Sequence, residues 1–117
     1  MGDLDPTVSN SDAYRTIFEN DRVRVLEYYD TPGHQTTPHE HPDSVMYTLS
    51  SYRRRLGSED GREAEVELAA GTVRWVGAQQ HYGENIGTTD SHCILVELKE
   101  PAPANAPAAE PVLGPSQ

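Results

Sequence analysis

Apolar and polar residues alternate with a period of two along most of the chain. Ala64, Val66 and Leu68 alternate with three glutamates, and segments 44–50 and 92–99 alternate in the same way. Successive side chains of a β-strand point to opposite faces of the sheet, whereas the pattern of a helix repeats about every 3.6 residues. The period therefore predicts strands, and the glutamates predict that the first of these strands has a solvated acidic face.

The alternation changes phase within one predicted strand. Val23 and Val25 would point to one face of the sheet, while Leu26 and Tyr28 would point to the other. A strand with such a change contains a β-bulge or is buried on both sides. A helical turn is allowed by the sequence in one place, residues 14–20.

Turn signals separate the predicted strands. Asp60-Gly61 is typical of a hairpin, because these residues tolerate the positive φ of tight turns. Further signals lie at residues 32–33, 70–71 and 85–87. Strands about every ten residues, without helices between them, predict an all-β sandwich or barrel.

The two ends of the chain differ from its middle. Residues 1–13 are mostly polar and are predicted to form a flexible N-terminus, while residues 101–117 are rich in proline and alanine. Proline removes backbone donors, so this tail is predicted to be disordered. The alternative is a docked tail, with Val112 and Leu113 in a groove. Residues 14–100 are predicted to form the single domain.

The charge balance is strongly acidic. Nine lysines and arginines face nineteen aspartates and glutamates, which gives a net charge of −10. Because such a surface repels phosphate groups, we expect no nucleic-acid partner and no membrane partner. We also find neither the roughly 18 apolar residues of a membrane helix nor a secretory signal. The single cysteine, Cys93, excludes an internal disulfide and fits a cytoplasmic location.

Histidines carry the clearest chemical signal. His39 and His41 are two residues apart, so on a strand both imidazoles reach the same face while Glu40 points away. Imidazole is the commonest metal ligand, and such a pair forms half a site. Taken alone, the pair is more often two surface histidines. His81, on a later strand, would complete a set of three ligands that leaves positions open for water or substrate.

These histidines belong to two longer patterns. Gly33 is followed by five residues and then by the triplet 39–41, and His81 is separated by three residues from Asn85. In this order and spacing, the two patterns resemble the two motifs of the cupins. The chain is most similar to small single-domain bacterial cupins, some of which are assigned to β-alanine degradation.

The resemblance has three implications. The fold would be an all-β double-stranded β-helix, the jelly-roll barrel of cupins. One divalent metal ion (Fe, Mn, Ni, Cu or Zn) would be held by His39, His41 and His81 in the barrel mouth. The protein would be a homodimer, since cupin barrels commonly pair through edge strands or sheet faces.

The sequence departs from the cupin motifs at one ligand. The first motif carries a glutamate where this chain has Val45 or Met46, or Ser44 in a shifted alignment. Water or a nearby polar side chain could take its place, the candidates being Asp43, Gln35 and His34. A site of three histidines without a carboxylate carries more positive charge. It should therefore stabilise an anionic small-molecule ligand, such as a carboxylate or enolate.

Other conspicuous side chains have more local interpretations. Tyr82 and Glu84 are candidates for proton transfer because they closely follow His81. The run Arg53–Arg55 is predicted to be a solvated strand edge, although one of the three points inward and could bind a substrate carboxylate. Core or supporting positions are predicted for Tyr47, Trp75, His92, Cys93 and Glu97. Glu97 could also hold a histidine in one tautomer.

Three functions from different classes fit this pattern. We favour a metal-dependent enzyme, a dioxygenase or an isomerase or lyase, acting on a small organic acid or oxygenated metabolite. The second possibility is a non-catalytic module that binds or senses a small molecule. The third is a degenerate structural barrel. Fold alone does not choose among them, because one barrel hosts many chemistries.

Overall fold

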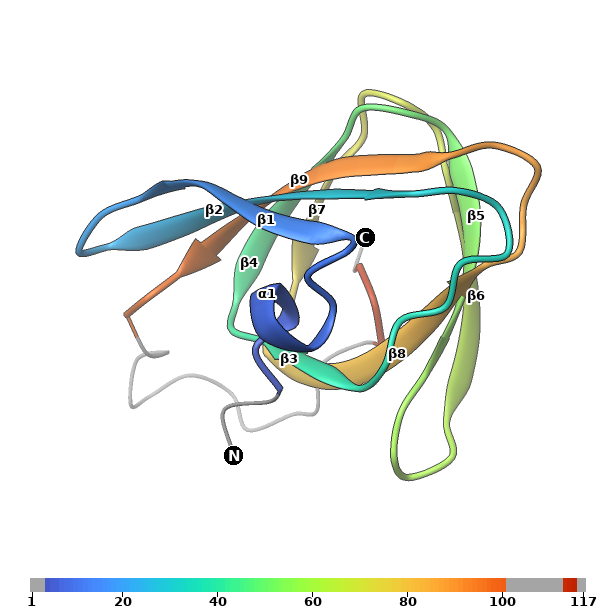
Figure 1. The fold of residues 1–117 in the computed structure, drawn as a ribbon, viewed down its shortest axis with the longest axis horizontal. Helices are drawn as coiled ribbons and strands as arrows, with labels where there is room; N and C mark the ends of the chain where they lie inside the picture. The colour runs from blue at the N-terminus through green and yellow to red at the C-terminus, as the bar shows by residue number, and fades with distance from the viewer. Residues whose placement is uncertain (1–3, 101–112, 116–117) are drawn as a thin grey trace.

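The computed structural model describes residues 4–100 and 113–115. These residues form one short helix and nine strands, in agreement with the alternation of the sequence (Figure 1). The elements are α1 (Pro6–Ser9), β1 (Tyr14–Glu19), β2 (Val23–Asp30), β3 (His39–His41), β4 (Ser44–Thr48), β5 (Tyr52–Gly57), β6 (Glu63–Leu68), β7 (Val73–Val76), β8 (Gln79–Asn85) and β9 (Ser91–Leu98).

The strands form two antiparallel sheets that face each other across a barrel. The five-stranded sheet has the order β1-β2-β9-β4-β7, and the four-stranded sheet has the order β3-β8-β5-β6. In the view of Figure 1, β2 and β9 pass along the top, β5 and β6 along the right, and β3 and β8 along the bottom. The predicted all-β double-stranded β-helix is confirmed.

Inward-facing residues of the sheets form the core. Along β9, buried and half-buried residues alternate strictly, and Cys93 and Leu95 lie on the buried side. Leu26 of β2 and Met46 of β4 belong to the same cluster. Burying such a side chain contributes about 1.5–3 kcal/mol to stability. Because Cys93 belongs to this cluster, the prediction that it is a small core residue is confirmed. Burial raises the pKa of its thiol to about 11.

The first strand corrects one expectation. The sequence allows a helical turn at residues 14–20, but the structure has the strand β1 there, paired with β2. The pairing register shifts between Thr16 and Phe18, opposite Leu26 and Val25. The bulge therefore lies in β1, opposite the change of phase in β2. Pairing along a whole neighbouring strand outweighs the weak local preference for a turn of helix.

The residues before β1 contain the helix α1. Asp5 caps this helix by accepting a hydrogen bond from the backbone N–H of Thr7, and Pro6 follows at its first position. Asn10 is buried, and its side-chain oxygen accepts a hydrogen bond from the N–H of Thr37 at 2.9 Å. This segment, for which the sequence predicts flexibility, is therefore hydrogen-bonded to the residues that precede β3.

The structure describes three residues, 113–115, of the tail that the sequence predicts to be disordered. Residues 101–112 and 116–117 lie outside the described part of the chain. Gly114 has a φ of +80°, a conformation that favours glycine. Its N–H donates a hydrogen bond to Oε1 of Gln79 at 2.8 Å. This short stretch therefore contacts the barrel, while Val112 of the docked-tail alternative lies outside the described residues.

Apolar side chains also cover the outer face of the five-stranded sheet. Cross-strand pairing places one apolar residue of every strand in a single row, namely Phe18, Val25, Val96, Val45 and Trp75. A second, shorter row beside it consists of Ile94, Tyr47 and Val73. We call these eight residues the outer apolar face.

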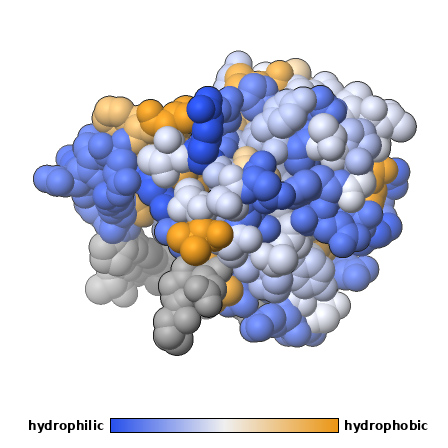
Figure 2. Space-filling model, viewed as in Figure 1, coloured by the Kyte–Doolittle hydropathy of each residue, from blue (hydrophilic) through white to orange (hydrophobic). Residues whose placement is uncertain are grey.

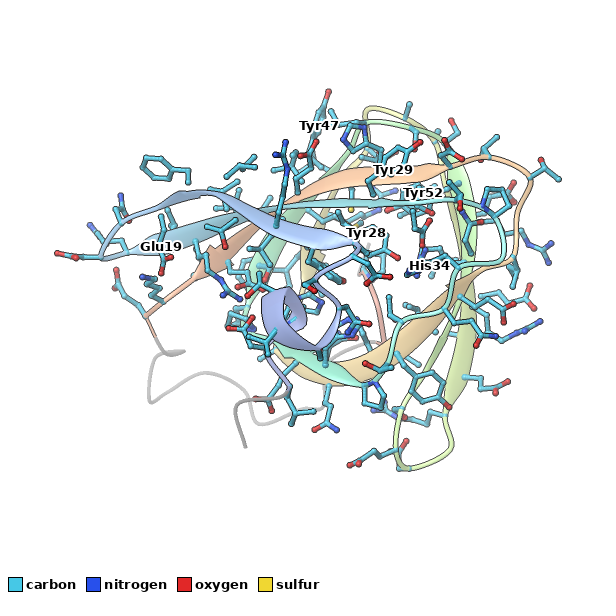
Figure 3. All side chains as sticks on the ribbon, in the orientation of Figure 1. Glu19, Tyr28, Tyr29, His34, Tyr47 and Tyr52 are labelled. Carbon is cyan, nitrogen blue, oxygen red and sulfur yellow. The ribbon has the colours of Figure 1, made fainter. Side chains whose placement is uncertain are left out.

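This face corrects the prediction that Tyr47 and Trp75 lie in the core. Their side chains are 44% and 43% exposed. Figure 3 shows Tyr47 above the upper sheet, outside the barrel, whereas Tyr28 lies below that sheet. Orange atoms gather at the upper left of Figure 2, at the end formed by β1 and β2. A period of two cannot tell which of two apolar faces is inside.

Candidate metal centre

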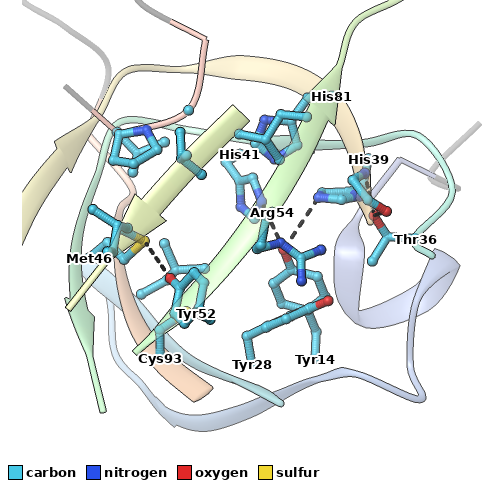
Figure 4. A pocket seen from close by; sticks show the side chains of 18 residues that line it. Tyr14, Tyr28, Thr36, His39, His41, Met46, Tyr52, Arg54, His81 and Cys93 are labelled. Atoms are coloured by element: carbon cyan, nitrogen blue, oxygen red, sulfur yellow. Dashed lines mark hydrogen bonds between the residues drawn. The ribbon is translucent and has the colours of Figure 1, made fainter. Parts of the chain in front are cut away.

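Two strands bring the three predicted metal ligands together. His39 and His41 point to the same side of β3, and β3 pairs with β8 in a register that puts His39 opposite His81. The three residues are 1%, 4% and 7% exposed, respectively. One ligand atom from each lies within 4.8 Å of the other two. Figure 4 shows the three imidazoles close together in a pocket.

A hydrogen bond orients each imidazole. Nδ1 of His39 lies 2.8 Å from the carbonyl oxygen of Thr37, Nδ1 of His41 lies 3.0 Å from Oε2 of Glu97, and Nδ1 of His81 lies 2.7 Å from Oε1 of Gln79. All three oxygens are acceptors, so each Nδ1 carries the hydrogen. The three Nε2 lone pairs are therefore free to bind a metal ion.

Glu97 has the role that the sequence analysis raised for it. It is 2% exposed, and one carboxylate oxygen accepts the hydrogen bond of His41. The other oxygen accepts hydrogen bonds from Arg24, at 3.0 Å from Nε and 2.9 Å from Nη2. Arg24 in turn pairs with Asp5 at 3.0 Å. The chain segment before β1 is thus linked to His41 through Arg24 and Glu97.

The environment keeps two of the three imidazoles, those of His39 and His81, neutral. Burial and the neighbouring His41 lower the pKa of His39 to about 4. Burial, with smaller contributions from His41 and His39, lowers the pKa of His81 well below its ordinary value. At neutral pH these two side chains therefore carry no proton on Nε2, which is the state that a metal ligand needs.

Tyr14 is the site residue that sequence reasoning missed. Its hydroxyl oxygen lies 3.3 Å from Nε2 of His39 and 3.3 Å from Nε2 of His41. Burial raises the pKa of Tyr14 far above its ordinary value. The segment that contains Tyr14 allows a helical turn, and no motif marks it, so nothing in the sequence linked it to histidines about 25 residues away.

The pocket beside the histidines is small and has two different walls. Its cavity volume is about 60 Å³, which accommodates a few water molecules or a small ligand. Tyr14, Tyr28 and Arg54 line it on the polar side, together with the histidines. The apolar lining consists of Met46, Leu56, Val66, Leu68, Val76 and Leu95.

Arg54 corrects the interpretation of the arginine run. Burial alternates along β5, so Arg53 and Arg55 are exposed while Arg54 points into the barrel and is 8% exposed. Its Nη1 donates to Asp30 at 2.6 Å, and its guanidinium carbon lies 5.0 Å from the centre of the Tyr28 ring. Arg53 and Arg55 are solvated as predicted, and both pair with Glu65. The predicted strand edge is wrong, because β5 lies between β6 and β8 in its sheet.

The three protein candidates for the missing glutamate lie elsewhere. Asp43 accepts a hydrogen bond from the Ala78 N–H at 2.8 Å. His34 pairs with Asp12 at 2.9 Å. Gln35 is exposed and forms an isolated antiparallel β-bridge with Glu84 of β8. Of Ser44, Val45 and Met46, the residues aligned with the motif's glutamate, Met46 lines the pocket.

The two candidates for proton transfer are not beside the histidines. Side chains alternate along β8, so Tyr82 and Glu84 lie on the opposite face from His81. They line a separate hollow on the outside of the barrel. Tyr82 covers Gly57 of the neighbouring strand, and Glu84 lies 3.7 Å from Arg55. His92 is half-buried and bonds to Glu27 at 2.7 Å, which fits its predicted structural role.

Comparison with known proteins identifies the fold that holds this site. No family model and no curated protein matches the sequence. Among solved structures, a cupin domain from Bordetella pertussis Tohama I is similar with a TM-score of 0.68 and 24% identity, over 74% of this chain and 92% of that one. This chain has the cupin fold.

Two further solved structures agree. A cupin with a double-stranded β-helix from Methanocaldococcus jannaschii has a TM-score of 0.58 and 14% identity, over 73% of this chain and 77% of that one. The polyketide cyclase RemF from Streptomyces resistomycificus has a TM-score of 0.54 and 22% identity, over 77% of this chain and 66% of that one. The cupin fold is shared at low identity, so function must be argued from the site.

The donor set fits a divalent transition metal. Three neutral imidazole nitrogens suit Zn, Cu, Fe and Ni, and a three-histidine set leaves ligand positions open toward the pocket. Each imidazole has the supporting hydrogen bond that metal-ligand histidines usually have. The cupin fold with these buried histidines therefore provides a possible three-histidine metal site.

Proposed function

We propose that this protein is a metal-dependent enzyme that acts on a small organic acid or oxygenated metabolite inside the barrel. The observation that carries the proposal is the convergence of three buried, oriented imidazoles on one small pocket. His39, His41 and His81 hold the ion, which could be Fe, Mn, Ni, Cu or Zn. When bound, the ion supplies Lewis acidity or redox chemistry to the substrate.

The charges around the pocket favour an anionic substrate. Arg54 is balanced by Asp30, and Glu97 is balanced by Arg24. The buried groups therefore sum to about zero, and a divalent ion held by neutral imidazoles adds a net positive charge. The cavity of about 60 Å³ suits a molecule of few atoms. Arg54 lies on the pocket wall, where it can orient a carboxylate.

The reaction types that fit are oxygenation, and isomerisation or lyase chemistry through an enolate. The apolar wall of the pocket excludes water from the substrate, while Thr37, Glu97 and Gln79 hold the histidine tautomers. That RemF is a polyketide cyclase supports an enzymatic use of this fold. The resemblance to cupins assigned to β-alanine degradation is compatible with a small organic acid.

A non-catalytic binding or sensing module is the second candidate. One observation favours it: among the described residues that line the pocket there is no carboxylate to act as an acid or base. Such a module would keep the metal and the anion but release the anion unchanged. Product analysis under air and under nitrogen separates the two candidates.

The first test is the metal content of untagged protein purified without added metal. We expect one equivalent of a transition metal in wild type and its loss in His41→Ala. His92→Ala is the matched control, since His92 bonds to Glu27 and lies outside the three-histidine set. Wild-type protein that cannot be loaded near neutral pH would contradict the proposed function.

We also propose that two copies of the chain pair through the outer apolar face. Its eight residues span all five strands of one sheet, and Val73 and Trp75 extend it to the edge strand β7. Four residues of this face are exposed, Phe18, Tyr47, Val73 and Trp75, and an exposed apolar patch marks an interaction surface. A second copy offers a matching face with the same chemistry.

The predicted cytoplasmic location stays a prediction. Within residues 4–100 and 113–115, no helix has the length and apolar character needed to cross a membrane.

A further inference from the structure

Tyr14 places a phenol oxygen beside two of the three metal-ligand nitrogens. It is the first residue of β1, is 7% exposed, and packs against Tyr28 with ring centroids 4.6 Å apart. Its hydroxyl lies 3.3 Å from Nε2 of both His39 and His41 (Figure 4). These two nitrogens are the free ones, because both Nδ1 atoms are hydrogen-bonded elsewhere.

The distances from the Tyr14 hydroxyl oxygen to the two Nε2 atoms match the distances between neighbouring ligand atoms of one metal ion. Metal–nitrogen bonds of about 2.0–2.1 Å in a tetrahedral site put neighbouring ligand atoms about 3.3–3.4 Å apart. The two oxygen–nitrogen distances of 3.3 Å agree with that spacing. They are also longer than an ordinary hydrogen bond of about 2.7–3.2 Å. The position of the phenol therefore suits metal ligation as well as hydrogen bonding.

The number of available protons points the same way. The Tyr14 hydroxyl carries one hydrogen, so it can donate to only one of the two Nε2 atoms. When both imidazoles are neutral with their hydrogens on Nδ1, the other Nε2 lone pair faces the lone pairs of the phenol oxygen, in a buried place. A cation among the three atoms removes this repulsion, since each atom directs a lone pair toward it.

We propose that Tyr14 is the fourth protein ligand of the metal centre and takes the place of the carboxylate that the first motif lacks. This inference rests on the proposed metal site. When the phenol oxygen binds Cu²⁺, an O–Cu bond forms and the O–H bond breaks. One proton leaves to solvent, and no electron is transferred.

The other side chain near this position is engaged differently. Met46 is one of the residues aligned with the motif's glutamate, but its sulfur accepts a hydrogen bond from the Tyr52 hydroxyl at 3.7 Å. Tyr52 is 5% exposed and lines the same pocket as Tyr14. Its hydroxyl bonds to Met46 and not to a histidine, so Tyr52→Phe is a matched control for Tyr14→Phe.

The experiment titrates Cu²⁺ into metal-free wild type, Tyr14→Phe and Tyr52→Phe. Electron paramagnetic resonance reports nitrogen ligands, and visible absorption reports a phenolate-to-copper charge-transfer band. We expect both signals in wild type and in Tyr52→Phe. Tyr14→Phe should keep the nitrogen signal, lose the band, and bind Cu²⁺ about 10- to 100-fold more weakly. Wild type should also release one more proton per Cu²⁺ than Tyr14→Phe does.

The outcomes separate the two proposals. A nitrogen signal without a charge-transfer band in wild type overturns the role of Tyr14 and leaves the histidine site intact. A band that persists in Tyr14→Phe overturns it as well. The absence of any nitrogen signal in wild type overturns the metal site and the inference together. If Tyr14→Phe does not fold, resonance Raman spectra of copper-loaded wild type decide, because bound phenolate has its own ring vibrations.

Discussion

At the scale of single residues, the three imidazoles differ in what orients them. His41 donates to the carboxylate of Glu97, whereas His39 and His81 donate to neutral oxygens. A carboxylate partner increases the basicity of a ligand imidazole and fixes its tautomer. Of the three supporting groups, Glu97 should therefore contribute most to metal affinity.

This difference predicts the effect of Glu97→Gln. The amide keeps the size of the side chain but removes the charge that faces His41, so metal affinity should fall about 10- to 100-fold. Competition with a zinc chelator of known affinity measures the change. Glu27→Gln is the control, because Glu27 bonds to His92 on the outer face. An equal fall in both variants would show that the effect is not specific to the site.

The histidines also predict how the metal-free protein responds to acid. The folded-state pKa of His39 is about 4, below its ordinary value of 6.5. Between these pH values the unfolded chain binds more protons than the folded chain, so stability falls as pH decreases from about 6.5 to about 4. His39 alone should account for a loss on the order of 3 kcal/mol.

Urea unfolding of metal-free protein at a series of pH values measures this loss. His39→Gln lacks the titrating group, so its stability should depend less on pH in the same window. Identical pH profiles for the variant and wild type would rule out the assigned contribution of His39.

At the scale of elements, a glycine and a tyrosine form a cross-strand pair on the outside of the barrel. Gly57 of β5 lies opposite Tyr82 of β8, and a Cβ on Gly57 would come within 2.5 Å of the Tyr82 ring. The ring is the far end of a 38% exposed side chain and can move aside in part, so the cost should lie at the low end of core overpacking, about 1 kcal/mol. Gly57→Ala should therefore lower the free energy of unfolding by about that amount.

A double-mutant cycle tests this contact. In a Tyr82→Ala background the ring is gone, so Gly57→Ala should cost clearly less than in wild type. Denaturant unfolding of the four proteins gives the coupling free energy. Additive effects would mean that Tyr82 does not cover Gly57.

The element scale also shows where sequence reasoning succeeded. Alternation and turn signals indicated most strands, and the spacing of His39, His41 and His81 indicated one shared site. Pairing of β3 with β8 was needed to bring the third histidine opposite the first. The sequence did not predict the strand β1, because what favours a strand there is the pairing with β2 and not a pattern within β1 itself. Tyr14 was missed together with that strand.

At the scale of the whole molecule, the outer apolar face predicts the oligomeric state. Wild type should have a mass in solution near twice its chain mass of 12.9 kDa. Trp75→Arg puts a charge into the face and should yield monomers, because a buried unpaired charge is costly. Sedimentation equilibrium measures both masses. Val8→Arg is the control, since Val8 is 62% exposed on α1 and lies outside the face. A monomeric wild type would refute the pairing.

The sequence by itself determined the period of the strands, the turns between them and the set of histidines, because these features depend on neighbours along the chain. It could not determine which apolar face of β4 and β7 is buried, or that Arg54 alone of three arginines points inward. Those outcomes depend on how strands far apart in sequence pair and close into a barrel. The same closure placed Tyr14 and Glu97 beside histidines, and no local pattern encodes such contacts.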